Sequence, residues 1–322
     1  MLSAPDINDT IQREVPGIYD SAETNAPGIC DFIEKDEGIT FGTWVWNKNE
    51  ILNPEEVLGF LVKNGINEIY LTYAPDMGFE NYRSFVRKSN EMGVRVSLIG
   101  ADAYWILERG YADRNAYFDF YESYQNTARE NEKFYGMHMD IEPHQLDEWT
   151  SDNESTVKKY CDFVLLARDV ADRTGTLLEL DIPCWFDPYP VREGDETINL
   201  CEFCIRHADT TLFMSYRDNA RAAVEFAHTG ILLGEKYDKK ISLAFETGKI
   251  YEDVNITFDH LGTVLLNEEL HKLRNIMDTE FNCQVGYAVH HYNSWVNLPL
   301  HGNPIGDDFP SDNPNYIHLL DK

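Results

Sequence analysis

Several features are scarce or missing in this chain of 322 residues, and each absence argues against a class of protein. No apolar run reaches 18 residues, so no membrane-spanning helix is predicted. The six cysteines are thinly spread, which argues against a disulfide framework. Cys201 and Cys204 have CxxC spacing without a second pair, and we expect them to be small apolar residues on a helix. No GxGxxG follows the first strand and no GxxxxGK[ST] occurs, which disfavours nucleotide-binding folds.

Basic residues are also few, with 27 Lys and Arg against 56 Asp and Glu, giving a net charge of −29. A field of that sign argues against nucleic acid or an anionic membrane as partner. The first residues, MLSAPDINDT, show neither the basic nor the apolar region of a secretory signal. The sequence therefore predicts a cytoplasmic protein if this N-terminus is native, and a secreted one if a signal peptide was removed. It gives no indication of oligomeric state.

What the chain does contain is a regular alternation of short β-type runs and longer amphipathic segments. Residues 1–38, acidic and rich in Pro, Gly and Asn, are expected to form an N-terminal arm packed on the main fold. Eight strands alternating with helices indicate an α/β fold with a parallel sheet, and we predict a (β/α)8 TIM barrel over residues 39–322. The expected strands are 40–46, 68–73, 95–100, 134–142, 177–183, 211–216, 240–247 and 285–292. The expected helices are 54–64, 79–92, 113–132, 152–174, 194–207, 217–235 and 263–279.

The fourth strand, FYGMHMDIE, ends in two carboxylates two positions apart. Side chains at i and i+2 of a strand share a face, so His138, Asp140 and Glu142 should point into the barrel mouth, where barrel enzymes keep their catalytic groups. Two carboxylates so close repel, and the pKa of one should rise. A carboxyl group that is still protonated near neutrality can serve as the general acid of glycosidic cleavage. The alternative is a buried acid pair satisfied by His138 and the backbone.

A short motif supports the catalytic interpretation. Residues 135–142 read Tyr-Gly-Met-His-Met-Asp-Ile-Glu, and Met214-Ser-Tyr216 follows at the sixth strand. This pattern resembles the chitinase-type glycoside hydrolases of family 18, which carry D-G-x-D-x-D-x-E on the fourth strand and M-x-Y-D on the sixth. Gly136, Asp140 and Glu142 match, whereas Tyr135 and His138 replace the first two acids and the Asp of the second motif is displaced to 218.

The resemblance implies roles for the matching residues. Glu142 would be the general acid/base, and Asp140 would orient a substrate acetamido group that acts as internal nucleophile. Tyr216 would hydrogen-bond that group, and Trp295 would close the site after the last strand. The substrate would be a carbohydrate, and no cofactor or metal is expected.

A second mechanism competes, because Glu246 closes the seventh strand in LAFETG. Many retaining barrel glycosidases have an acid/base Glu on strand four and a nucleophile Glu on strand seven. A separation of about 5 Å between Glu142 and Glu246 would suit retention, and roughly 6.5–9.5 Å would suit inversion. Alternatively, Glu246 caps a turn or binds a substrate hydroxyl.

Further residues at strand ends are predicted to bind substrate. Asp181 is expected to accept a hydrogen bond in the pocket, and only one of His290 and His291 can face inward, because neighbouring strand residues point in opposite directions. Aromatic rings at the rim suggest a platform for sugar faces. The predicted substrate-binding set is His138, Tyr216, Asp181, Trp44, Trp46, Tyr73, Trp185, His290, Tyr292 and Trp295.

Three hypotheses for function remain open from the sequence. The leading one is a glycosidase with Glu142 as proton donor and Asp140 or Glu246 as partner. The second is a metal-dependent hydrolase, since His and carboxylate side chains at the strand ends are suitable ligand types. The third is a catalytically idle barrel that binds glycans.

Overall fold

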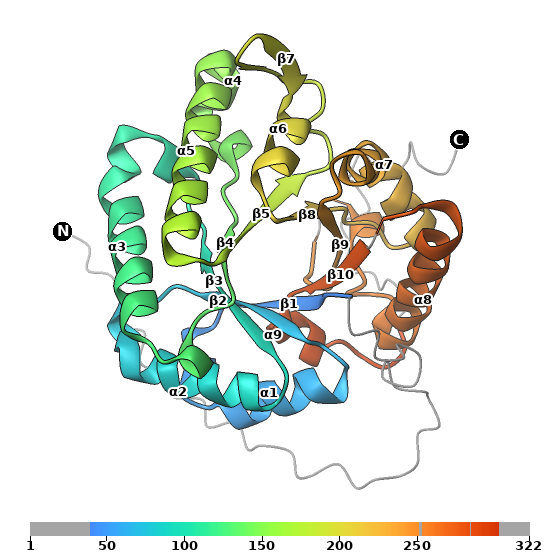
Figure 1. Cartoon of the computed structure of the whole chain (residues 1–322). Helices are drawn as coiled ribbons and strands as arrows, with labels where there is room; N and C mark the ends of the chain where they lie inside the picture. The colour runs from blue at the N-terminus through green and yellow to red at the C-terminus, as the bar shows by residue number, and fades with distance from the viewer. Residues whose placement is uncertain (1–38, 251–252, 284, 303–322) are drawn as a thin grey trace, which may run out of the picture.

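The computed structural model describes residues 39–250, 253–283 and 285–302, and its centre is a closed barrel of eight parallel strands in the order β1-β10-β9-β8-β5-β4-β3-β2 (Figure 1). The predicted barrel is confirmed, and each predicted strand overlaps one in the structure. The predicted N-terminal arm lies outside the described residues. The strands are β1 Phe41–Val45, β2 Glu68–Thr72, β3 Arg95–Gly100, β4 Gly136–Met139, β5 Leu177–Pro183, β8 Thr210–Met214, β9 Lys240–Glu246 and β10 Val285–His290.

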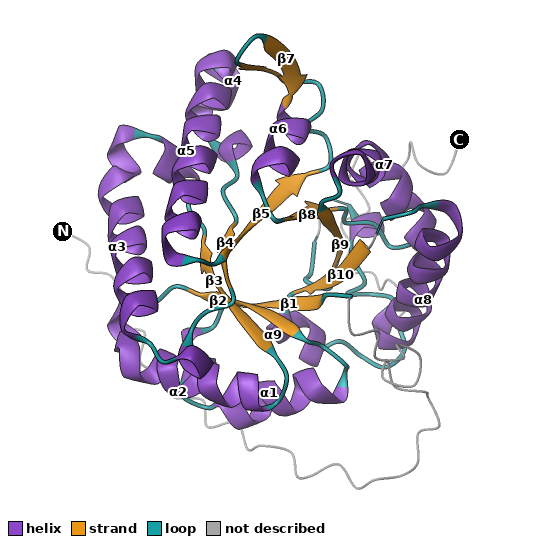
Figure 2. Ribbon diagram, in the orientation of Figure 1, coloured by secondary structure: helices purple, strands orange, loops and turns teal. Residues whose placement is uncertain are grey.

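Helices surround the barrel, as Figure 2 shows. Their sequence signals agree with their ends: Pro54 opens the first helix, and Gly175 ends the longest one in a left-handed conformation (φ +66°). None of the helices within the described ranges is long and apolar enough to cross a membrane. The helices are α1 Pro54–Lys63, α2 Gly78–Glu91, α3 Tyr111–Thr127, α4 Asp147–Ser151, α5 Asn153–Thr174, α6 Leu200–His207, α7 Ala220–Tyr237, α8 Gly262–Glu280 and α9 Tyr292–Val296.

One predicted helix begins later than expected. Residues 190–199 form an antiparallel hairpin, β6 Pro190–Glu193 and β7 Glu196–Asn199, and only residues 200–207 are helical. The turn between the strands is Gly194-Asp195, with Gly194 at φ +59°, a conformation that glycine adopts without strain. Asn199 then caps α6 by accepting a hydrogen bond from Glu202 N. Cys201 and Cys204 are free thiols buried in that helix, as expected.

The strands separate two buried regions, one between the barrel and the helices and one inside the barrel. Their outward side chains, including Met139 and Ile141, join the large apolar core beneath the helices. The inward side chains form a smaller apolar cluster inside the barrel, made of Trp44, Tyr70, Ile99, Leu212, Ala244 and Ala288. Polar groups share this inner space, so the barrel interior is where buried charge must be accommodated.

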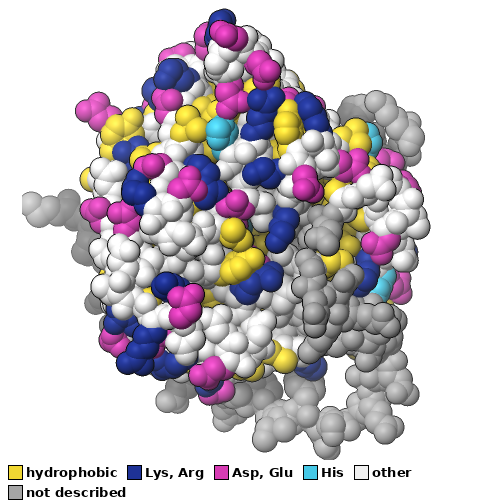
Figure 3. Space-filling view, viewed as in Figure 1, with side chains coloured by type: hydrophobic (Ala, Val, Ile, Leu, Met, Phe, Trp, Pro, Cys, Tyr) yellow, Lys and Arg dark blue, Asp and Glu magenta, His cyan; other side chains and the backbone are white. Residues whose placement is uncertain are grey.

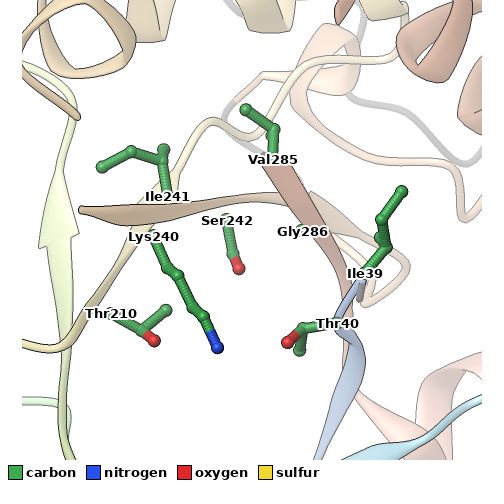
Figure 4. Close-up of a pocket in the computed structure, with 8 residues that line it drawn as sticks. All are labelled: Ile39, Thr40, Thr210, Lys240, Ile241, Ser242, Val285 and Gly286. Atoms are coloured by element: carbon green, nitrogen blue, oxygen red, sulfur yellow. The ribbon is translucent and has the colours of Figure 1, made fainter. Parts of the chain in front are cut away.

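At the end of the barrel where the strands begin, the first residues of several strands come together. A small pocket there is lined by Thr40, Thr210, Lys240, Ser242 and Gly286, among others (Figure 4). Gly286 is required at this point, because a Cβ would lie 2.4 Å from Ser242 Oγ. On the outer surface seen in Figure 3, acidic, basic and hydrophobic side chains are interspersed. The functional groups therefore have to be sought at the other end, where the strands finish.

Candidate active site

Strand β4 ends earlier than predicted, at Met139, and this places its two carboxylates just beyond the strand. Asp140 N still donates to Gly100 O (2.9 Å), which keeps the chain extended for one more residue. Pro143 then begins a short 3-10 turn, so the chain bends away directly after Glu142. His138 is fully buried, whereas Asp140 and Glu142 are half-buried. The predicted row thus runs from the barrel interior to its mouth.

Burial and nearby negative charge raise the pKa of two carboxyl groups at this mouth, Asp140 and Glu142. Burial, followed by the charges of Asp181 and Glu142, raises the pKa of Asp140 well above its usual value. Burial and then the charge of Asp181 also raise the pKa of Glu142. Asp140 Oδ1 and Asp181 Oδ1 are enclosed without a hydrogen-bond partner among the described residues. The raised pKa values favour the protonated forms of Asp140 and Glu142, and the two unpartnered oxygens of Asp140 and Asp181 are available to a ligand or water.

The side chain of Glu142 is held by residues of the 3-10 turn that directly follows it. Gln145 Nε2 donates to Glu142 Oε2, and His144 Nε2 lies 3.7 Å from Glu142 Oε1. The half-buried ring of Trp185, beyond the end of β5, contacts His144 with ring centroids 5.1 Å apart. Trp185 therefore belongs to the wall beside Glu142, and it continues into an aromatic group with Trp149.

A second wall comes from β9, β10 and the end of β1. His290 Nδ1 lies 2.7 Å from Glu246 Oε2, and Trp46 Nε1 donates to His290 Nε2 (3.1 Å). Because Nε2 accepts from the indole, His290 is the neutral tautomer with its proton on Nδ1, donated to Glu246. Gly248 N donates to the other oxygen of Glu246. Both carboxylate oxygens of Glu246 are therefore engaged by the protein.

Tyr216 and Trp44 connect the two walls. Burial, and then the charges of Glu246 and three further carboxylates (Asp181, Asp140 and Glu142), raises the pKa of Tyr216 well above its usual value. Its phenol therefore stays protonated and able to donate a hydrogen bond, and all four carboxylates act on it electrostatically. Trp44 Nε1 donates to Asp181 Oδ2 (3.0 Å), and its ring lies 5.1 Å from that of His290. The predicted residues that the structure brings together are Trp44, Trp46, His138, Asp140, Glu142, Asp181, Tyr216, Glu246 and His290, with Trp185 at the edge.

Three predicted binding residues lie elsewhere, so their expected position at the mouth is corrected. Tyr73 packs on Tyr117 and Phe120 of α3 and donates to Ala116 O. Tyr292 and Trp295 are buried on the outside of the barrel, where both contact Phe60 of α1. Each follows a strand end at a position whose side chain turns outward, and their large apolar rings fill the outer core. Asp218, the displaced acid of the second motif, lies in the β8–α7 loop, where it accepts from Asn219.

A set of buried polar residues lies below the mouth and was not predicted from the sequence. Glu179 on β5 contacts His138, and Glu68 on β2 pairs with Arg95 on β3. Tyr70 stacks on His138 with centroids 3.9 Å apart. The signal was present, since Glu179 precedes Asp181 by two residues and therefore shares its face. Within the residues that are described, no group of three or more His, Cys, Asp or Glu is arranged to hold a metal ion.

Comparisons with known proteins were made for the sequence and for the fold. No protein-family model and no curated protein matches the sequence. A chitinase from Bacteroides thetaiotaomicron has a similar structure, with 11% identity, a TM-score of 0.47, and coverage of 80% of this chain and 90% of that chain. A 3-keto-D-glucoside 4-epimerase from E. coli is 15% identical, with a TM-score of 0.46 and coverage of 88% and 98%.

A family 18 chitinase from Cycas revoluta, solved with (GlcNAc)3, is 13% identical, with a TM-score of 0.41 and coverage of 80% of this chain and 96% of that chain. The solved structures similar to this chain thus include chitinase-type barrels, the family that its fourth-strand motif resembles, alongside a sugar epimerase.

Proposed function

We propose that this chain cleaves glycosidic bonds, with Glu142 as general acid/base and a carbohydrate as substrate. The observation that carries the proposal is the acid group at the end of β4. Glu142 is half-buried at the barrel mouth, and its pKa is raised by burial and by Asp181. A carboxyl group in that state can give a proton to a departing sugar oxygen. Half-buried aromatic side chains nearby, Trp46 and Trp185, suit the apolar faces of sugar rings.

Asp140 is the better partner for Glu142. It is the next residue on the same face, its Oδ1 has no partner among the described residues, and its pKa responds to Glu142. Glu246 has both oxygens engaged by His290 and Gly248. A carboxylate so engaged suits the orientation of His290 or the binding of a substrate hydroxyl better than nucleophilic attack. We therefore place Asp140 beside a substrate group that acts as internal nucleophile, with the Tyr216 phenol as a donor to that group.

The decisive experiment uses aryl glycosides whose leaving groups differ in acidity. A general acid matters most for a poor leaving group and little for a phenolate that departs unaided. Glu142→Gln should therefore lower kcat/KM by about 10²–10⁴-fold for a methylumbelliferyl glycoside and far less for a dinitrophenyl glycoside. Asp147→Asn is the matched control, because Asp147 is an exposed acid in the first turn of α4 and should leave both rates unchanged.

The choice of partner is tested with the same substrates. Asp140→Asn should lower activity more than Glu246→Gln, and glycosides with a 2-acetamido group should be cleaved in preference to those without one. If Glu246→Gln is the inactive variant and azide restores its turnover, Glu246 is the nucleophile and Asp140 a supporting residue. Equal activity of Glu142→Gln and wild type on both leaving groups would rule out the assignment of Glu142. Binding without turnover across a glycan panel would make the chain a lectin-like barrel.

A further inference from the structure

His138 has a carboxyl oxygen close to each of its two ring nitrogens, an arrangement that suits a protonated imidazole better than a neutral one. Its Nδ1 lies 3.2 Å from Glu179 Oε2, and its Nε2 lies 2.8 Å from Asp181 Oδ2. The second contact is a close ion-pair approach rather than an aligned hydrogen bond. A neutral ring has one nitrogen that donates and one that only accepts. In that state one ring nitrogen would present its lone pair to a carboxylate oxygen in a fully buried place.

The two carboxylates reach the ring from one strand. Glu179 and Asp181 are alternate residues of β5, which lies beside β4, and His138 is paired in register with Glu179. Tyr70 stacks on the ring, and the edge of Trp44 lies beside it. These contacts fix the orientation of the His138 ring, with a carboxyl group close to each ring nitrogen.

Glycine makes room for the lower acid. A Cβ on Gly136, two residues before His138, would lie 2.8 Å from Ser97 Oγ and 3.2 Å from the Glu179 carboxyl carbon. The inward face of β4 is thus hollow at the level where Glu179 must fit. The position of Glu179 against His138 consequently depends on local backbone space as well as on charge.

The remaining charges form a short chain toward the closed end of the barrel. Glu68, which is buried, lies near Glu179, and Arg95 donates to it from Nε (3.0 Å) and from a terminal nitrogen (2.7 Å). Burial and then the charge of Glu179 raise the pKa of Glu68 well above its usual value, although Arg95 opposes this. Burial opposes ionisation of Glu179, but hydrogen bonds involving His138 and Glu68 hold its pKa below the usual value. One proton is therefore shared by this carboxyl pair, with Glu68 as its main holder.

With Asp181 counted as a carboxylate, the charge count then favours a cation at His138. Arg95 carries +1, the pair Glu68 and Glu179 carries −1, and Asp181 carries −1. The buried chain is neutral if His138 carries +1 and negative if it does not. A net charge in the interior is expensive, so neutrality favours the imidazolium. In agreement, burial alone would lower the pKa of His138, but the charges of Asp181 and Glu179 outweigh it and raise the pKa to about 10.

We propose that His138 is an imidazolium throughout the physiological pH range and acts as a positioning residue, holding Asp181 as a carboxylate whose negative charge favours the protonated form of Glu142. The charge of His138 itself acts on Asp140 in the opposite sense to that of Asp181. The charge of His138 does not depend on the proposed function. Only its consequence, the protonated state of Glu142 as a catalytic acid, rests on that function. The groups that face the ring are Glu179 and Asp181 from β5, Asp140 from β4 itself, Tyr70 from β2 and Trp44 from β1.

The charge state is tested by ¹⁵N NMR of the histidine rings in the full chain, which needs no substrate. His138 is assigned by the signals that disappear in His138→Gln. Both of its ring nitrogens should stay protonated between about pH 5 and 8, where ordinary histidines titrate. A neutral ring, or an ordinary titration in that range, would overturn the proposal. Loss of glycosidase activity in the separate assays would leave this result intact.

The cause of the charge is tested by removing one acid. Glu179→Gln should bring the titration of His138 down toward the ordinary range, whereas Glu269→Gln, an equally buried acid between α7 and α8, should leave His138 unchanged. An unaltered His138 in Glu179→Gln would contradict the proposed chain. If Glu179→Gln does not fold, Asp181→Asn removes the other acid and must produce the same change.

The effect on the mouth is measured by ¹³C NMR of the carboxyl groups. Because the charge of Asp181 raises the pKa of Glu142, Asp181→Asn should move the Glu142 titration midpoint to lower pH. A Glu142 midpoint that stays in place would refute the coupling between the buried chain and the acid, even if His138 is charged.

Discussion

The charged state of His138 leads to a prediction about stability and pH. His138 has a pKa of about 10 in the folded chain against 6.5 in the unfolded one. A raised folded pKa adds stability that is fully present below pH 6.5 and is lost as pH rises through about 10. The difference corresponds to about 5 kcal/mol at most, of which roughly 4 remains at pH 7 and about 1 at pH 9. The wild type should therefore lose about 3 kcal/mol from this group between pH 7 and 9.

The assay is urea-induced unfolding of wild type and His138→Gln at several pH values between these limits. The variant is less stable at pH 7, because it leaves Glu179 and Asp181 buried without their cation, a loss of about 3–5 kcal/mol for a broken buried pair. Groups remote from His138 titrate alike in both proteins and cancel in the difference. The gap between the two free energies of unfolding should narrow as pH rises. If the two proteins lose stability in parallel, His138 is not the charged group and the reasoning fails.

Three further predictions concern single side chains. Gly136→Ala should lower the free energy of unfolding by about 1–3 kcal/mol because its Cβ meets Ser97 and Glu179, whereas Gly59→Ala, at a helix position with open space, should raise it by about 0.5–1 kcal/mol; denaturant unfolding compares them. Trp46→Phe removes the donor to His290 Nε2 and should lower kcat/KM by about two- to tenfold, with an unchanged rate contradicting a role for this hydrogen bond. Trp185→Ala should raise KM by about two- to tenfold with little change in kcat, and a pure kcat effect would exclude stacking of substrate on that ring.

Much of the fold could be predicted from the periodicity of the apolar residues and from the Gly and Pro residues at the ends of helices. Each expected strand is present because its outward residues are apolar and helices, several of which begin or end at Gly or Pro signals, cover them. The hairpin at residues 190–199 was missed because each of its strands has four residues and buries only one apolar side chain, Val191 or Ile198, which is too few to show an alternating pattern. Its only clear sequence signal was Gly194-Asp195, a turn pair placed where a helix was expected.

The candidate site was partly predictable for a simple geometric reason. Spacing by two fixes which strand residues face inward, and this placed His138, Asp140 and Asp181 correctly. It failed beyond the strand ends, where the chain turns and the alternation stops. Trp295 follows β10 by five residues within α9, and its direction depends on how that helix packs against Phe41 and Phe60. No local pattern encodes that packing.

The buried chain also explains how a histidine can occupy the middle of the acid row. The chitinase-type pattern has an acid at this position, and a histidine changes the charge there from −1 to +1. The structure offsets the change on the neighbouring strand, where Glu179 and Asp181 flank the ring, and beneath it, where Glu68 and Arg95 complete a neutral set. Asp140 and Glu142, which match the last two acids of that pattern, lie half-buried at the mouth. The motif on the fourth strand shows only the altered residue. The residues that compensate its charge lie on other strands, and only the three-dimensional structure brings them together with His138.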